Sequence, residues 1–138
     1  MPLGVEDRMA ITELLSMHGH LFDAGELDRL DELFTDDIVY DVTDLGAAEP
    51  LVGIAAIRDA SLALGPANPV GHHITNIVLT ELADGQVRAL SKGIGINADG
   101  TSGSATYEDT IVPGDQGWRI GHRKVLARRV PLGGKYGR

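Results

Sequence analysis

The chain has 138 residues, 43% of them hydrophobic and 23% charged, which is typical of one globular domain with a real core. Its net charge of −8 disfavours nucleic acid or an anionic membrane as a partner. The absence of cysteine excludes disulfides, a thiolate nucleophile and a cysteine-ligated metal. The sequence has no signal-peptide pattern and no run of about 18 apolar residues. We therefore expect a cytoplasmic protein with a single domain over residues 1–138.

The first half of the chain has the apolar spacing of helices. Apolar residues recur every three or four positions over residues 11–23, which predicts a helix that stops at Gly25. The same spacing over residues 27–34 predicts a second, shorter helix. Residues 38–42 are typical of a short strand. Residues 54–64 predict a third helix, which ends where a Gly-Pro pair follows.

From Val70 onward, the apolar period changes from that of a helix to that of a strand. Turn signals at residues 84–85, 99–100 and 114–115 divide this half into four segments of about ten residues, as in a chain of hairpins. Glycines inside the segments favour bulges and strong bending. Helices followed by a long meander predict an α+β fold, in which a cone-shaped curved antiparallel sheet is wrapped by N-terminal helices around a central pocket.

Asp23 and His72 are the residues most suggestive of chemistry. Asp23 closes the first predicted helix, and His72 opens a predicted strand. The two meet only if the helix packs across the sheet. In that case Asp23 would accept the ring N–H of His72 and leave the other ring nitrogen free to take a proton. The alternative is that Asp23 caps a turn and His72 is a hydrogen-bonded core residue.

Strand alternation also suggests neighbours for His72. It places Asn76 on the same face, where its amide would bind a substrate oxygen or simply be satisfied inside the protein. Adjacent His73 points the other way, and His18 and His20 do not share a helix face. No cluster has convincing ligand spacing, so we expect no metal.

Other side chains could line the cavity or support the sheet. Tyr107 and Asp109 share one strand face, and either role suits them. At most one of Tyr40 and Asp41 can point inward. Trp118 fits the core better than a stacking platform. Basic residues at the end of the last strand could attract an acidic substrate group, although such charges more often form a solvated edge; they are Lys124, Arg128 and Arg129.

Several segments, taken together and in order, resemble the SnoaL-like branch of the nuclear-transport-factor-2-like superfamily. They are residues 11–25, 33–37, 53–58, 72–76 and 107–109, and the Trp118-Arg119-Ile120 stretch with Arg123. The resemblance covers nearly the whole chain. It implies a cone-shaped α+β barrel around a pocket, assembled as a homodimer or a higher homo-oligomer.

The resemblance also implies an activity. Scytalone dehydratase, bile-acid dehydratase and hexachlorocyclohexane dehydrochlorinase carry an Asp–His pair that matches Asp23 and His72, in a His-x-x-x-Asn frame that Asn76 completes. The implied protein is a lyase or isomerase, dehydratase-like or a polyketide cyclase, that needs no cofactor. Its substrate would be small, apolar and cyclic, such as a polyketide, steroid or terpenoid. The expected substrate-binding residues are His18, Tyr40, Asn76, Tyr107 and Arg123.

Two positions limit what can be carried over. His18 stands where relatives commonly have a tyrosine, five residues before the aspartate. Limonene epoxide hydrolase uses an Arg-x-Asp motif, and the comparable residues here are Tyr107 and Asp109, which disfavours epoxide hydrolysis. The alternative to an enzyme is a non-catalytic module of the same fold, either a small-ligand binder or an oxygenase β-subunit-like protein.

Overall fold

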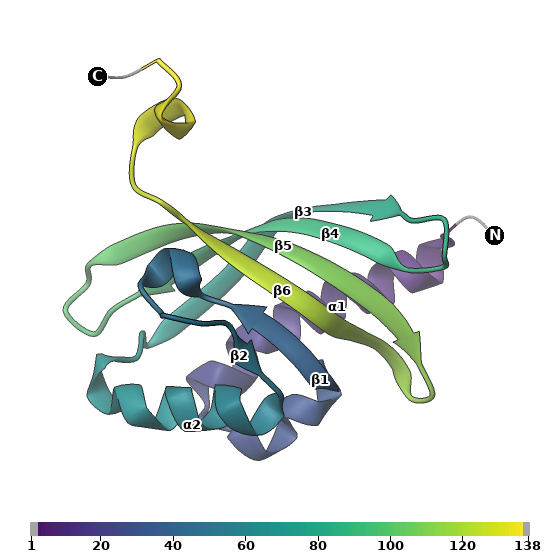
Figure 1. The fold of residues 1–138 in the computed structure, drawn as a ribbon, viewed down its shortest axis with the longest axis horizontal. Coiled ribbons are helices and arrows are strands. Elements are labelled where there is room, and N and C mark those ends of the chain that lie inside the picture. Colours follow the sequence, from purple (N-terminus) through teal and green to yellow (C-terminus); the bar gives the residue numbers. More distant parts are fainter. Residues whose placement is uncertain (1–2, 137–138) are drawn as a thin grey trace.

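The computed structural model describes residues 3–136 (Figure 1). Its helices and 3-10 turns are α1 (Val5–Asp23), η1 (Leu27–Glu32), η2 (Thr43–Leu45), α2 (Ile54–Leu64), η3 (Gly65–Ala67) and η4 (Pro131–Gly134). Its strands are β1 (Phe34–Asp41), β2 (Leu51–Val52), β3 (Gly71–Glu81), β4 (Val87–Ile96), β5 (Ser102–Gly114) and β6 (Gly117–Arg128). The prediction of an α+β fold with a curved sheet and covering helices is confirmed. Across residues 3–136, no helix is long and apolar enough to cross a membrane.

The six strands form one sheet in the order β2-β1-β6-β5-β4-β3. All neighbours are antiparallel except β1 and β6, which run parallel. The parallel pair arises because α2 carries the chain from β1 and β2 across to the far edge, and the meander then returns strand by strand. Within the described residues β2 and β3 do not pair with each other, so the sheet is open at this seam, whereas the resemblance implied a barrel.

The helices lie against the sheet, as Figure 1 shows: α1 packs across β3 and β6, and α2 packs on β1 and β2. The buried side of α1 includes Ile11, Leu14, Leu15 and Leu21, which repeat at helical spacing. The helix predicted over residues 27–34 is present as a 3-10 helix over Leu27–Glu32 and is wrong only at its last two residues. The carbonyl of Leu33 accepts a hydrogen bond from the backbone N–H of Ile120, and Phe34 begins the strand that pairs with β6.

A bulge in β3 changes which of its residues face inward. The register with β4 shifts between Thr75 and Val78, and Asn76 has φ +55°, in the left-handed region. Ile77 therefore turns toward the core, while Asn76 is exposed. The prediction that Asn76 shares the inner face of His72 is wrong, because strict alternation fails at this bulge.

A second bulge acts in the same way on β6. The register with β5 shifts where Thr110 pairs with His122 and Ile111 pairs with Ile120, which leaves Gly121 as the extra residue. Arg123 is thereby brought to the inner face and is fully buried. Without the shift, Ile120 and Arg123 would point to opposite sides of the sheet.

The crossing of α1 over β3 depends on Gly19. A Cβ atom at this position would overlap the backbone carbonyl oxygen of His72. Glycine thus lets the helix backbone touch the strand backbone. The contact lies one turn before the end of α1, so it fixes the height of Asp23 above the sheet.

Candidate active site

Asp23 and His72 are in direct contact. The distance between His72 Nδ1 and Asp23 Oδ1 is 2.6 Å, and the backbone N–H of His72 donates to Asp23 Oδ2 at 3.1 Å. The side chains are 19% and 29% exposed for His72 and Asp23, so neither is sealed in the interior. Both carboxylate oxygens are engaged, which holds the carboxylate and the imidazole in one mutual orientation. The contact predicted from the sequence is present.

This geometry assigns the proton of the imidazole. A carboxylate is only an acceptor, so Nδ1 of His72 donates to Asp23 when the ring is neutral. Nε2 is then the free acceptor. His72 lines the main cavity, whereas Asp23 borders a neighbouring pocket instead. The pair is therefore arranged as a base that faces the cavity and a carboxylate that orients it.

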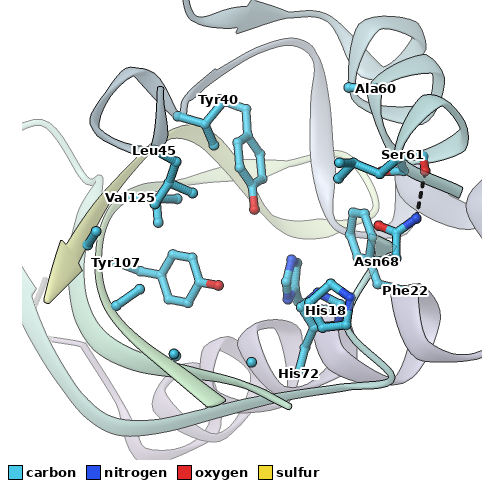
Figure 2. Close-up of a pocket in the computed structure, with 18 of the residues that line it drawn as sticks. His18, Phe22, Tyr40, Leu45, Ala60, Ser61, Asn68, His72, Tyr107 and Val125 are labelled. Carbon is cyan, nitrogen blue, oxygen red and sulfur yellow. Dashed lines mark hydrogen bonds between the residues drawn. The ribbon is translucent and has the colours of Figure 1, made fainter. Parts of the chain in front are cut away.

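The cavity has a volume of about 560 Å³, within the usual range for a small-molecule site. It lies between the inner face of the sheet and the two helices, and Figure 2 shows labelled side chains from both layers around the same open space. Apolar side chains dominate its wall, among them Phe22, Leu45, Leu51, Ile57, Leu64 and Val125. Such a wall suits a small, mostly apolar molecule.

His18 lies beside His72 and is 2% exposed. The two rings meet edge-on with centroids 5.6 Å apart, and the Tyr107 ring is 6.0 Å from His18. Burial lowers the pKa of His18 well below its usual 6.5, with further lowering from electrostatic repulsion by Arg123 and His72. His18 is thus neutral near pH 7. Its Nδ1 has no hydrogen-bond partner among the described residues.

Tyr40 and Tyr107 point their hydroxyl groups into the cavity (Figure 2). Burial raises the pKa of both phenols, and for Tyr40 the nearby Arg123 guanidinium partly opposes this. Both are therefore neutral hydrogen-bond donors near pH 7. The Tyr107 ring lies over Gly93, where a Cβ atom would overlap it. Glycine at this position lets the ring lie against the sheet.

Arg123 stands behind the two tyrosines rather than in the cavity wall. It is 0% exposed, and its Nε and Nη2 donate to the two carboxylate oxygens of Asp109 at 2.7 and 2.9 Å. Its guanidinium carbon lies 4.5 Å from the ring centroid of Tyr107 and 5.7 Å from that of Tyr40. Burial lowers the pKa of Arg123, but Asp109 outweighs this and the net direction is upward. The group stays charged.

Two of the predicted substrate-binding residues are therefore placed elsewhere. Arg123 is not in the cavity wall, because the β6 bulge buries it beneath Tyr40 and Tyr107. Asn76 is exposed on the other face of β3, because the β3 bulge turns it outward. The remaining predicted residues, His18, Tyr40 and Tyr107, line the cavity with His72.

Some contributors were missed from the sequence. Gly19 and Gly93 allow the close contacts described above, and a glycine inside a helical pattern is a signal that could have revealed Gly19. Asn68 lines the cavity next to α2, and its Nδ2 donates to the carbonyl of Ser61 (Figure 2) and also to that of Gly65. Its local role gave no sequence signal. In residues 3–136, no three His, Asp or Glu side chains are grouped so that they could hold a metal ion.

Fold and site together define a class of protein: a small α+β domain with an apolar cavity, whose wall contains the histidine of a histidine–carboxylate pair. The chain belongs to the SnoaL-like domain family, whose model matches residues 4–124. No curated protein matches the sequence.

Solved structures show the same fold. An NTF2-like protein with a cystatin-like fold from Novosphingobium aromaticivorans is 27% identical, with a TM-score of 0.75 over 93% of this chain and 86% of the other. A candidate aromatic ring hydroxylase from the same organism is 26% identical, with a TM-score of 0.70 over 94% of both chains. A candidate scytalone dehydratase from that organism, 20% identical, has a TM-score of 0.68 over 91% and 86% of the two chains. At that identity, the last comparison shows the fold alone.

Proposed function

We propose that this protein is a cofactor-independent lyase or isomerase that acts on a small apolar cyclic substrate, such as a polyketide, steroid or terpenoid. The observation that carries the proposal is the 2.6 Å contact between Asp23 and His72, with His72 lining an apolar cavity of about 560 Å³. A histidine that only stabilised the core would not need a free ring nitrogen at a cavity wall.

In the proposed reaction, Nε2 of His72 takes a proton from a substrate carbon next to a carbonyl. The electron pair of the broken C–H bond moves toward the carbonyl and forms an enolate. Asp23 stabilises the imidazolium that results. His72 then returns the proton, either to a departing hydroxyl, which leaves as water, or to another carbon, which completes an isomerisation. No external oxidant or reductant is needed.

The tyrosines supply the second half of the chemistry. Tyr40 and Tyr107 are neutral donors that reach into the same cavity, and each would donate a hydrogen bond to the substrate oxygen as negative charge develops on it. One such donor is worth roughly 10²–10³ in rate in a site shielded from water. His18 is neutral, and its lowered pKa makes it a weak base. It can therefore bind the substrate oxygen while His72 takes the proton from the substrate carbon.

The direct test replaces His72. Candidate polyketides, steroids and terpenoids are first screened by thermal shift, because a ligand that binds only the folded state raises its apparent stability. On a substrate found in this way, His72→Ala should lose roughly 10²–10⁴ in kcat. The matched control is His73→Ala, since His73 is the next residue, is exposed and points to the other face. A His72→Ala protein with the kcat of the wild type would rule out this mechanism.

A second function has one observation in its favour. The 26% identical relative is a candidate aromatic ring hydroxylase, which fits the alternative that this chain is an oxygenase β-subunit-like or ligand-binding module. Such a module does not need the Asp23–His72 contact. Co-purification of the full chain with an oxygenase α subunit, unaffected by Asp23→Asn, would favour this alternative over the enzyme.

We also propose that the protein works in the cytoplasm as a homodimer or higher homo-oligomer. The support for the oligomer is a group of exposed apolar side chains on the outer face of β3 and β4, formed by Val78, Leu90 and Ile94. Val78 and Leu90 are cross-strand partners, so they form one continuous surface. Light scattering should show an oligomer for the wild type and a smaller species for Leu90→Glu. A monomeric wild type would contradict the proposal.

A further inference from the structure

The inner face of the sheet next to His72 carries almost no side-chain volume. Gly95 is the cross-strand partner of His72, and Gly103 is the partner of Gly95 on the next strand. One row further in, Ala105 is the partner of Ala127. All of these residues line the cavity. We call Gly95, Gly103, Ala105 and Ala127 the bare patch.

Neither the backbone conformation nor the surrounding atoms require glycine at Gly95 and Gly103. Neither has a positive φ. Among described atoms, none lies within 4 Å of a Cβ added at Gly103, and the nearest to a Cβ at Gly95 is Pro69 Cγ at an ordinary 3.6 Å. Gly19 and Gly93 differ, because a Cβ there would overlap neighbouring atoms. The open space at the bare patch is therefore a property of the cavity and not a demand of the fold.

The dimensions of the bare patch follow from sheet geometry. Its first row lies on β4 and β5 and its second row lies on β5 and β6, so the patch runs diagonally across the sheet, and each row joins two strands about 4.8 Å apart. Its two rows lie two residues apart along a strand, which is about 7 Å. A flat ring can keep a contact of about 3.5–4.0 Å over such an area, whereas a puckered ring touches at a few hydrogens and leaves voids.

We propose that the bare patch receives the flat face of a fused, planar ring system, and that Gly95 and Gly103 set the size of ring that fits. The inference rests on the proposed function, since it concerns the substrate of the same cavity. His72 lies at one end of the row that contains Gly95 and Gly103, and the Tyr107 ring covers the neighbouring Gly93. A ring on the patch thus has its edge, rather than its face, toward the base and the phenol.

The experiment compares two probes with the same carbon skeleton and hydroxyl group, planar 2-naphthol and saturated trans-2-decalol. Their binding to the full chain is measured by isothermal titration calorimetry. The wild type should bind 2-naphthol at least about tenfold more tightly than the decalol, a difference well above the error of the method. Gly103→Leu should weaken 2-naphthol binding by about tenfold or more, because the new side chain fills the ring site.

Ser102→Leu is the matched control, because Ser102 precedes Gly103 on the same strand and is exposed. It should leave 2-naphthol affinity unchanged. If urea unfolding shows that Gly103→Leu does not fold, Gly95→Leu is used in its place. Equal affinity for the two probes, no detectable binding of 2-naphthol to the wild type, or unchanged affinity in the leucine variant would overturn the inference.

His72→Ala separates this inference from the proposed function. It should keep 2-naphthol affinity within a few-fold, since the bare patch is intact, whereas the proposed function requires that turnover fall. Tighter binding of 2-naphthol than of the decalol, with no turnover that depends on His72, would support the bare-patch inference and contradict the catalytic proposal. His72-dependent turnover of a puckered substrate, with no planar selectivity, would do the opposite.

Discussion

Gly19→Ala should break the contact between Asp23 and His72 without replacing either residue. The added methyl would overlap the backbone carbonyl oxygen of His72, and backbone atoms cannot turn aside as a flexible side chain can. Restoring an ordinary contact of about 3.5 Å requires α1 to move away from β3 by about 1 Å. Asp23 lies one turn further along the same helix and moves with it, which breaks the 2.6 Å contact with His72 Nδ1.

The magnitude has two opposing parts. Overpacking of this kind destabilises a protein by about 1–3 kcal/mol. Replacing glycine by alanine inside a helix stabilises by about 1 kcal/mol. We therefore expect the free energy of unfolding to fall by about 0–2 kcal/mol, so the variant stays folded. Catalysis is more sensitive, because a displacement of about 1 Å can reduce the rate by about 10²-fold.

Urea unfolding measures the stability, and ¹⁵N NMR of the imidazole reports whether Nδ1 of His72 still donates its proton to a carboxylate. The control is Ser16→Ala, an exposed position of the same helix, which should change the free energy of unfolding by less than about 0.5 kcal/mol. The reasoning would be refuted by a Gly19→Ala protein with the wild-type His72 spectrum and a stability equal to or above that of the wild type.

Three further predictions concern the surroundings of the site. The pKa of His18 is lowered in the folded state, so the unfolded chain binds the extra proton and the free energy of unfolding should fall below about pH 6.5, by about 1.4 kcal/mol per pH unit for this group. When urea unfolding is measured between about pH 7 and pH 5, the free energy of unfolding should fall less steeply with falling pH for His18→Phe than for the wild type. Equal pH dependence would contradict a lowered pKa for His18. Arg123→Met should destabilise by about 3–5 kcal/mol in urea unfolding, because it leaves the Asp109 carboxylate buried without a partner, and adding Asp109→Leu should recover most of the loss; no recovery would rule out the buried ion pair as the cause. Gly93→Ala should destabilise by about 1–3 kcal/mol through the overlying ring, and Gly103→Ala, with open space around its Cβ, should change thermal unfolding little; equal effects would show that the overlap does not matter.

Much of the fold could be predicted from local signals. The helix over residues 54–64 appears in the structure with the predicted bounds, because Gly65 and the proline after it stop it. The three hairpin turns lie where Asp-Gly and Gly-Asp pairs occur. These features depend on neighbours within a few residues, so the sequence carries them directly. The short strand β2 was missed, since two residues at an edge have too little period to be seen.

The candidate site was predicted in part, and the failures share one cause. Asn76 and Arg123 were assigned to the cavity, but each lies at or after a bulge. The bulge in β3 leaves Asn76 exposed, and the bulge in β6 brings Arg123 to the inner face, where it is buried behind Tyr40 and Tyr107. A bulge is decided by the register with the neighbouring strand, which is not a local property. His18, Tyr40 and Tyr107 line the cavity, as the resemblance implied. Tyr40 does so although the register of β1 with β6 also shifts, between Phe34 and Val39.

The sequence by itself determined an α+β fold, the location of its turns and the two side chains most suited to proton transfer. Only the tertiary structure decided that Asp23 and His72 touch, because the contact needs α1 to cross β3 at Gly19, where two backbones meet. The bulges and the bare patch were decided in the same way. The helical and strand periods can be read from the spacing of apolar residues in the sequence, whereas the approach of distant backbones depends on how all the layers pack together.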